Sequence, residues 1–324
     1  MNSREARYAW LLKVYPKHYR DERGEEILGT LLDASFDHGG AGPAMLEVVD
    51  VLSHGFQKRL GLTSDRFGGR ILETAAAPGM TMGAALAVFL FIWGEWLPLM
   101  GHSPMATRFG PFLTIGPVIY LAWVLGAAGS LLWPRRRRSL ATVCVTGTLV
   151  AVPIGKIFFA SPNIWQLVLL ASLGVPGILA PTTASYRRRV ASSLVAGAVT
   201  FAMFWWFGAI HPVGAPYIES FYWYGNYFMG HGLPLMAGGA FLTAIVLFGL
   251  RMHERAGAVV VLTSPMLIIG AANLREADGF IGGNSGEIEL AIMGAAALMI
   301  PIAWLAVAWS LDLRKTAAGS SDPT

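Results

Sequence analysis

The stretch APGMTMGAALAVFLFIWGEWL, residues 77–97, decides the fold class of this chain. It contains one ionisable residue, Glu95, and is long enough to cross a bilayer as a helix, which requires ~20 predominantly apolar residues. Further apolar segments follow along the sequence and give eight candidates in all. The seventh candidate, residues 257–272, is the shortest. We predict about eight membrane-spanning helices, over residues 77–97, 112–133, 140–160, 164–183, 190–210, 233–250, 257–272 and 288–311.

The composition supports the same class. Of the 324 residues, 54% are hydrophobic and 14% are charged, and the mean hydropathy is +0.53. Soluble globular proteins are less apolar and more charged, so we predict an all-α, polytopic membrane protein. The single cysteine, Cys144, excludes an intrachain disulfide and a thiolate metal cluster. The N-terminus MNSREARYAW lacks the uninterrupted apolar region of a signal peptide, so we expect it to stay in the cytosol.

Lys and Arg residues mark alternate ends of the predicted helices. Basic clusters at 135–138, 187–189, 251–255 and 314–315 follow the second, fourth, sixth and eighth segments, whereas the intervening loops contain Arg108 and Arg275. Positive residues favour the cytoplasmic side. We therefore predict a multi-pass protein of the plasma membrane with both termini in the cytoplasm. Because helix orientation explains the clusters, they give no case for nucleic-acid binding.

The chain before the first span is charged and amphipathic. Apolar residues recur at helical spacing in three segments, Ser3–Val14, Lys17–Phe36 and Ala44–Leu60, and Pro16 and the sequence DHGGAGP separate them. We predict a cytoplasmic three-helix domain over residues 1–62. A linker over 63–76, a transmembrane domain over 77–312 and a disordered tail over 313–324 complete the organisation. The region through Glu73 has 10 basic and 11 acidic residues, which argues against direct nucleic-acid binding and leaves a protein-interaction module.

One run in this region, LLKVYPKHYRDERGEEILGTLLD, residues 11–33, resembles a known family. It is similar to the HAAS-type and permease-prefix domains found at the N-terminus of many bacterial, especially actinobacterial, multi-pass membrane proteins. Their hallmark is Tyr-Pro followed by Tyr-Arg, then Gly-Glu-Glu and a Leu-rich helix. The matching residues are Tyr15, Pro16, Tyr19, Arg20, Gly24, Glu25, Glu26, Leu28 and Leu31. The resemblance covers about a fifth of the chain and implies a cytoplasmic regulatory domain, commonly associated with a PadR-like transcriptional regulator or attached to a permease.

The candidate partner-binding residues lie in this run. They are Tyr15, Pro16, Tyr19, Arg20, Glu25 and Glu26. Replacing Glu25 and Glu26 with Lys is expected to weaken partner capture and to leave membrane insertion intact. The expected partner is a cytoplasmic protein, either a transcriptional regulator or an ATPase subunit. An ATPase would have to be a separate subunit because this chain has no P-loop.

Two ionisable residues in the predicted spans are further candidates, because charges at membrane depth are costly. Glu95 and Lys156 lie near the outer ends of the first and third segments. They could snorkel to the interface, pair with each other, or form a step of an ion path. The small residues Gly79, Gly83 and Ala87 form a face suited to close helix packing or to dimerisation.

The predicted outer loops contain the remaining candidates. His102, His211 and His231 could hold a divalent metal if they converged, but their spacing matches no metal motif. The aromatic loop 211–232 is typical of an interfacial belt, with a lid over an outward pocket as the alternative. We predict no catalytic residue, no cofactor and no metal site.

Three functions are compatible with these features. The first is a membrane-embedded sensor or regulator that reports a cue through its N-terminal domain. The second is a permease or transporter subunit with a regulatory prefix. The third is an intramembrane enzyme acting on lipid, which lacks the clustered carboxylates and histidines that such chemistry requires. A structure in which the polar side chains all face loops would favour the first function over the other two.

Overall fold

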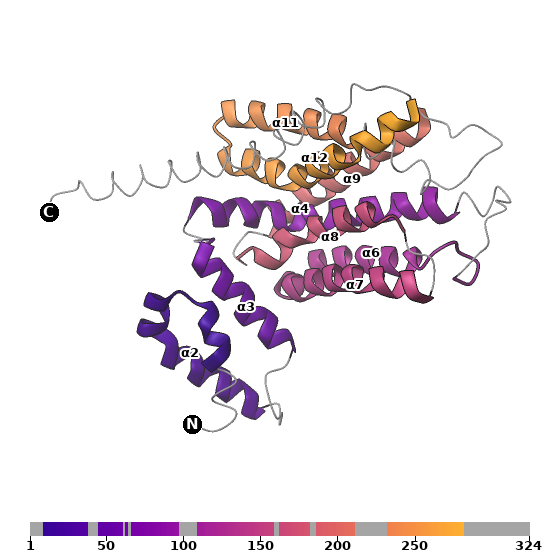
Figure 1. Ribbon diagram of the computed structural model, residues 1–324. Helices are drawn as coiled ribbons and strands as arrows, with labels where there is room; N and C mark the ends of the chain where they lie inside the picture. Colours follow the sequence, from indigo (N-terminus) through magenta and orange to yellow (C-terminus); the bar gives the residue numbers. More distant parts are fainter. Residues whose placement is uncertain are drawn as a thin grey trace.

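The computed structural model describes residues 9–37, 45–60, 62–63, 66–96, 109–158, 162–181, 186–210 and 232–281. The regular elements in these ranges are all helices, with no strand among them, so the all-α prediction is confirmed for the described part. Figure 1 shows a small N-terminal domain, residues 9–60, beside a larger helical bundle, residues 66–281. The predicted helix at 288–311, residues 211–231 of the aromatic loop and the C-terminal tail lie outside the described residues.

The N-terminal domain consists of a 3-10 turn, η1 (Leu12–Val14), and two helices, α2 (Lys17–Asp37) and α3 (Met45–Leu60). Tyr15 separates η1 from α2 with an extended backbone, because a residue that precedes a proline is disfavoured in the helical region. The apolar faces of the three elements meet in one cluster, as their spacing predicts. Its buried members are Leu11, Leu12, Tyr15 and Val51.

The bundle is built from seven described helices. They are α4 (Phe67–Leu90), extended by the π-helical turn η2 (Phe91–Trp96), α6 (Gly116–Leu132), α7 (Arg137–Phe158), α8 (Ile164–Leu179), α9 (Tyr186–Ile210), α11 (Leu233–Gly249) and α12 (His253–Ile281). A 3-10 turn, η3 (Pro134–Arg136), joins α6 to α7. Helix α4 is central and packs against α6, α8, α9 and α12, whereas α11 packs on α12 (Figure 1).

Two predicted boundaries are wrong. The linker expected over 63–76 is largely helical, because α4 begins at Phe67 and its first turns are buried against the rest of the bundle. The seventh apolar segment, expected to be the shortest, lies inside α12, which has 29 residues. In both places charged residues such as Glu73 and Arg255 end the apolar run. They do not end the helix, because Glu and Arg are good helix formers.

Close packing around α4 depends on two glycines. A Cβ atom at Gly79 would lie 2.5 Å from the backbone carbonyl oxygen of Leu173 in α8. A Cβ atom at Gly83 would lie 2.3 Å from the indole ring of Trp123 in α6. The small face predicted at Gly79, Gly83 and Ala87 is therefore occupied by neighbouring helices of the same chain, and it is not available as a dimer face.

Two helical stretches, Phe67–Trp96 and Pro134–Gly155, are long and apolar enough to cross a membrane. The described residues contain further apolar helices of 10–17 residues. These are Gly116–Leu132, Ile164–Leu179, Val190–Trp206 and Leu233–Gly249. By length and composition, the structure thus supports two candidate spans.

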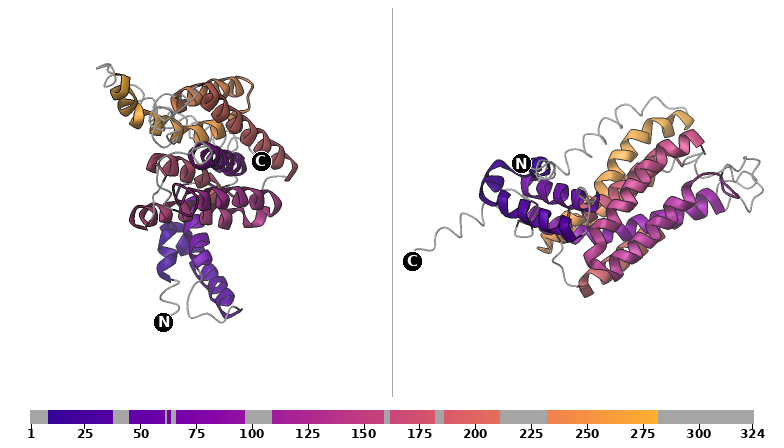
Figure 2. Two further views of the ribbon diagram at one scale, coloured as in Figure 1. Left: turned by 90° about the vertical axis from the view of Figure 1, so that its right-hand side faces the viewer. Right: turned by 90° about the horizontal axis from the view of Figure 1, so that it is seen from below.

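Successive helices of the bundle alternate in direction (Figure 2). The start of α4 and the turns α6–α7, α8–α9 and α11–α12 therefore gather at one end, where Arg70 of α4 meets Glu254 of α12. This end contains the basic clusters 135–138, 187–189 and 251–255, and we call it the basic end. The N-terminal domain lies at the basic end, and Gln57 of α3 contacts the last turn of α8 there.

Candidate functional site

Tyr15, the first residue of the Tyr-Pro motif, lies in the core of the N-terminal domain. Its side chain is 2% exposed, and its ring stacks on that of Tyr19 with centroids 5.4 Å apart. Its hydroxyl oxygen lies 3.0 Å from Nδ1 of His54 in α3. Lys58 places its Nζ 5.0 Å from the centroid of the Tyr19 ring, within cation–π distance. Tyr15 is therefore a core residue of the N-terminal domain, and its predicted part in shaping a partner surface would be indirect.

The other five candidates lie at the start of α2 and along its surface. Pro16, Tyr19 and Arg20 are half-buried, whereas Glu25 and Glu26 are exposed. The apolar positions of the helix, including those at 27, 28, 31 and 32, face the domain core. The exposed side chains of α2 are mostly acidic, and we call this exposed surface the acidic face. Its further exposed carboxylates are Asp21, Glu22 and Asp33.

The N-terminal domain is joined to the bundle at the end of α8. Gln57 of α3 is 4% exposed, and its side-chain amide donates a hydrogen bond to the carbonyl of Leu179. From α7, Arg137 donates to the Pro181 carbonyl at 3.0 Å, and Arg138 reaches the Ala180 carbonyl at 3.5 Å. A helix leaves its last carbonyls without intrahelical partners and carries partial negative charge there. The end of α8 thus receives donors from both parts of the chain.

Arg137 of the RRRR cluster makes buried contacts of its own. Its side chain is only 1% exposed, and burial of a guanidinium is costly unless acceptors surround it. The carbonyls of Ala180 and Pro181 provide such acceptors. The basic end is also tied by Arg70, whose Nε lies 2.7 Å from Oε1 of Glu254. These contacts hold the starts of α4, α7 and α12 and the end of α8 in one place.

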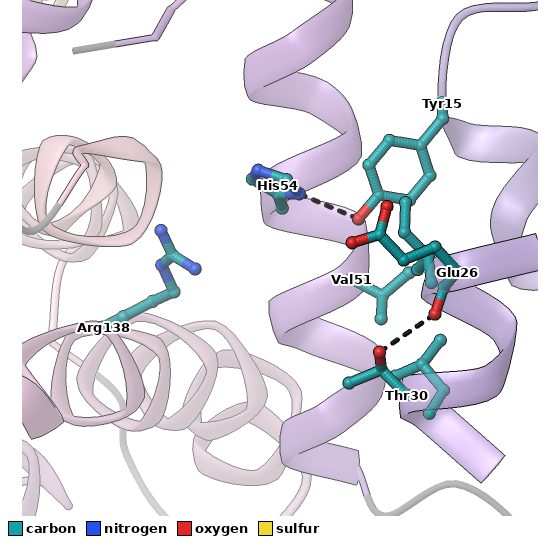
Figure 3. Close-up of a pocket in the computed structure, with 8 residues that line it drawn as sticks. Tyr15, Glu26, Thr30, Val51, His54 and Arg138 are labelled. Carbon is teal, nitrogen blue, oxygen red and sulfur yellow. Dashed lines mark hydrogen bonds between the residues drawn. The ribbon is translucent and has the colours of Figure 1, made fainter. Parts of the chain in front are cut away.

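A pocket of about 340 Å³ lies between the N-terminal domain and the bundle. Figure 3 shows Arg138 on the bundle side, facing a wall formed by the N-terminal domain. That wall consists of Tyr15, Glu26, Ile27, Thr30, Leu31, Val51 and His54. The Thr30 hydroxyl donates to the backbone carbonyl of Glu26 at 2.9 Å, so its proton is engaged within α2. The pocket therefore combines an apolar floor with a cation from the bundle and a carboxylate from the N-terminal domain.

Glu95 occupies a separate polar node at the opposite end of the bundle. It lies in the π-helical turn η2 and is 0% exposed. Its carboxylate accepts hydrogen bonds from the backbone N–H of Leu113 at 2.8 Å, from that of Thr114 at 3.3 Å, and from the Thr114 hydroxyl. Glu95 thus fastens the turn before α6 to the end of α4. Single π-helical turns are frequent at functional sites. The contacts described for Glu95 are structural, because they hold two segments of the backbone together.

The remaining candidates are less informative. Lys156 lies in the last turns of α7, and the placement of its side chain is outside the described part, so its predicted pairing with Glu95 stays a prediction. His102, His211 and His231 lie outside the described residues. Within the described ranges, no three His, Cys, Asp or Glu side chains are grouped so that they could hold a metal ion.

Three residues at the contact between the N-terminal domain and the bundle were not found from the sequence. His54 and Gln57 have no distinctive spacing and lie on a helix whose apolar positions gave the only signal. Arg138 was interpreted with its neighbours as a signal for helix orientation. Its place in the RRRR run, immediately beside the predicted span, could have indicated a role at the junction, but its contact with α8 requires the tertiary structure.

Comparison of the chain with protein-family models, with curated proteins and with solved structures finds no match.

Proposed function

We propose that this protein is a polytopic integral membrane regulator whose cytoplasmic N-terminal domain binds a protein partner. The outer surface of the bundle supports membrane embedding. Large apolar side chains on α6, α7, α9 and α11 are more than half exposed, where a soluble protein rarely leaves contiguous apolar surface. They include Leu121, Leu125, Ile157, Phe158, Trp206, Leu235 and Leu242. In a bilayer these side chains would face lipid.

The basic end gives the orientation that we propose. Clusters of Lys and Arg favour the cytoplasmic side of a membrane. The N-terminal domain lies at that end, so it would project into the cytoplasm with the acidic face of α2 exposed. The candidate spans Phe67–Trp96 and Pro134–Gly155 would cross the bilayer with their first residues on the cytoplasmic side.

Polar groups inside the bundle support a regulator over a transporter. The buried hydroxyls of Ser130, Thr148 and Thr263 each donate to a backbone carbonyl three or four residues earlier in the same helix. Thr81 similarly bonds its own helix and the carbonyl of Ser193 in α9. Hydroxyls used in this way stabilise helices and their packing, and they are not available to line a path for a polar cargo.

One observation favours the alternative of a permease subunit. Gln166, near the start of α8, is 1% exposed, and neither its side-chain amide nor the buried Ser193 hydroxyl of α9 has a hydrogen-bond partner among the described residues. A buried amide without partners costs free energy, and it marks a place where a polar cargo could bind. The alternative rests on these two side chains, whereas the regulator proposal rests on the position of a whole domain.

The observation that carries the proposal is the junction at the end of α8. Gln57 ties the N-terminal domain to α8, so a shift of that helix in response to a cue would change the position of α2. Such coupling requires an element with two alternative arrangements, and both the cue and the partner must shift the equilibrium between them. The acidic face of α2 would then be the surface that a cytoplasmic protein recognises, a transcriptional regulator in the regulator proposal and an ATPase subunit in the permease alternative.

The test is co-purification of partners with the full-length, tagged protein from membranes of its source organism. Glu22→Lys/Glu25→Lys reverses two exposed charges that do not line the junction pocket. We expect it to reduce the recovered partner at least about tenfold, which corresponds to 1.4 kcal/mol of binding free energy. Arg23→Glu, on the flank of the same helix, is the matched control and should retain capture.

The results separate the candidate functions. Recovery of a transcriptional regulator supports the regulator, whereas recovery of an ATPase supports the permease subunit. Equal capture by the wild-type protein and the double variant, with both correctly inserted, would show that the acidic face of α2 is not the partner surface.

A further inference from the structure

An open pocket lies between the N-terminal domain and the bundle, and its lining makes it a candidate ligand site. Its volume of about 340 Å³ lies in the range of small-molecule pockets, which are mostly apolar with a few convergent polar groups. Ile27, Leu31 and Val51 give it an apolar floor. Arg138 and Glu26 bring charges of opposite sign from two different parts of the chain (Figure 3).

The two charges restrict the ligand chemistry. Arg138 would attract an anionic ligand group and Glu26 a cationic one, so a ligand with only one of these charges would complement only one of the two side chains. The carboxylate of Glu26 takes part in no ion pair within the described residues, so it can accept a ligand donor. A zwitterion with its two charges on adjacent groups would complement both side chains at once.

The position of Arg138 identifies the anionic group. It lies in the first turn of α7, within the candidate span Pro134–Gly155, at the basic end. At that level of a membrane the prevailing anion is the lipid phosphate, and guanidinium groups bind phosphate through paired hydrogen bonds. This step rests on the membrane embedding proposed above.

We propose that this pocket binds a ligand carrying a phosphate and a primary amine, with the phosphate on Arg138 and the amine on Glu26. Phosphatidylethanolamine headgroups and free phosphoethanolamine share this chemistry. The hydrogen bond between Tyr15 and His54 holds the wall of the pocket between the two charges. An occupied pocket would hold the N-terminal domain against the bundle, because its ligand contacts both.

The test uses the full-length protein in neutral detergent, titrated calorimetrically with short-chain phosphatidylethanolamine, phosphatidylcholine and phosphatidylglycerol. Phosphatidylcholine keeps the phosphate but cannot donate a hydrogen bond to Glu26, and phosphatidylglycerol has no amine. Free phosphoethanolamine is titrated in parallel to distinguish a soluble source from a lipid. The variants are Arg138→Gln and Glu26→Gln, with Arg135→Gln and Glu25→Gln as controls, since these two exposed residues do not line the pocket.

We expect phosphatidylethanolamine to bind about tenfold more tightly than the other two lipids, and each pocket variant to remove most of this preference. Glu26→Gln is the decisive variant because Glu26 is exposed on α2, whereas Arg138 also contacts the end of α8. If phosphoethanolamine binds with the same dependence on both variants, the source is soluble. If only the lipid binds, the source is the membrane.

Equal affinity for the three lipids would overturn the proposal, as would an Arg135→Gln variant that weakens binding as much as Arg138→Gln. Partner capture is measured on the same preparations with Glu22→Lys/Glu25→Lys. A wild-type protein that captures its partner but binds the three lipids equally would reject the ligand alone. A clear lipid preference without any captured partner would reject the regulator and leave the ligand site in place.

Discussion

Replacing Gly79 with Ala tests the packing of α4 against α8. The added Cβ would lie 2.5 Å from the carbonyl oxygen of Leu173, where ordinary contact begins at 3.4 Å, a shortfall of about 0.9 Å. The obstructing atom belongs to the backbone of a helix, so it cannot rotate away as a flexible side chain would. The two helices must separate, or α8 must bend, to admit one methyl group.

The magnitude follows from two opposing effects. Overpacking a well-packed core typically costs ~1–3 kcal/mol, and a backbone obstruction justifies the upper end. Exchange of Gly for Ala in a helix contributes about 1 kcal/mol in the other direction. We therefore expect Gly79→Ala to lower the free energy of unfolding by about 2 kcal/mol, combining these terms. Gly147→Ala in α7 is the control, because a Cβ there would meet nothing within 4 Å.

The chain contains its own probe for this measurement. Cys144 is the only cysteine and is 3% exposed, packed between α7 and α6, so a thiol-reactive dye should report its exposure on heating. Gly79→Ala should label at a lower temperature than the wild-type protein, and Gly147→Ala at the same or a higher one. Coincident labelling curves for the two variants would refute the close approach of α4 and α8.

Two further changes address buried polar contacts and use the same thermal labelling. Thr148→Val removes the acceptor of the Trp123 indole N–H, a 2.8 Å bond inside the bundle, and should cost ~1–3 kcal/mol because the donor stays buried. Thr146→Val, whose exposed hydroxyl bonds only its own helix, should be near neutral, and equal losses would contradict this account. Glu95→Gln should destabilise the protein by ~1.5–3 kcal/mol, since charge-assisted bonds to Thr114 weaken. An unchanged thermal labelling curve would mean that the hydrogen bonds of Glu95 do not contribute to the stability of the protein.

The sequence predicted the helices well because the signals are local. Seven described helices overlap the predicted apolar segments, and α2 and α3 match the amphipathic segments before them. Apolar run length and helical spacing depend on neighbours within a few turns. The predicted helix boundaries were wrong where Glu73 and Arg255 interrupted the apolar run. A charged residue lowers the hydropathy of a segment, but it does not prevent the backbone from continuing as a helix.

The candidate site was predicted only in part. The exposed positions of Glu25 and Glu26 follow from the amphipathic pattern of α2, and both side chains are exposed in the structure. The burial of Tyr15 beside Leu11 and Leu12 agrees with their common helical face, but the residue that Tyr15 contacts in α3 could not be anticipated in the same way. His54 joins it from 39 residues away, and no local pattern relates the two positions.

The sequence by itself therefore determined the all-helical class, the positions of the helices and the end at which basic residues gather. Only the tertiary structure decided which apolar faces meet. The sequence of a helix that is apolar on every side does not indicate which helices it packs against. Gly79 could therefore equally have faced lipid, another copy of the chain or α8. The same holds for the contact between the N-terminal domain and the bundle, where Gln57 of α3 and Arg138 of α7 reach the end of α8 because the packing of whole helices brings them there.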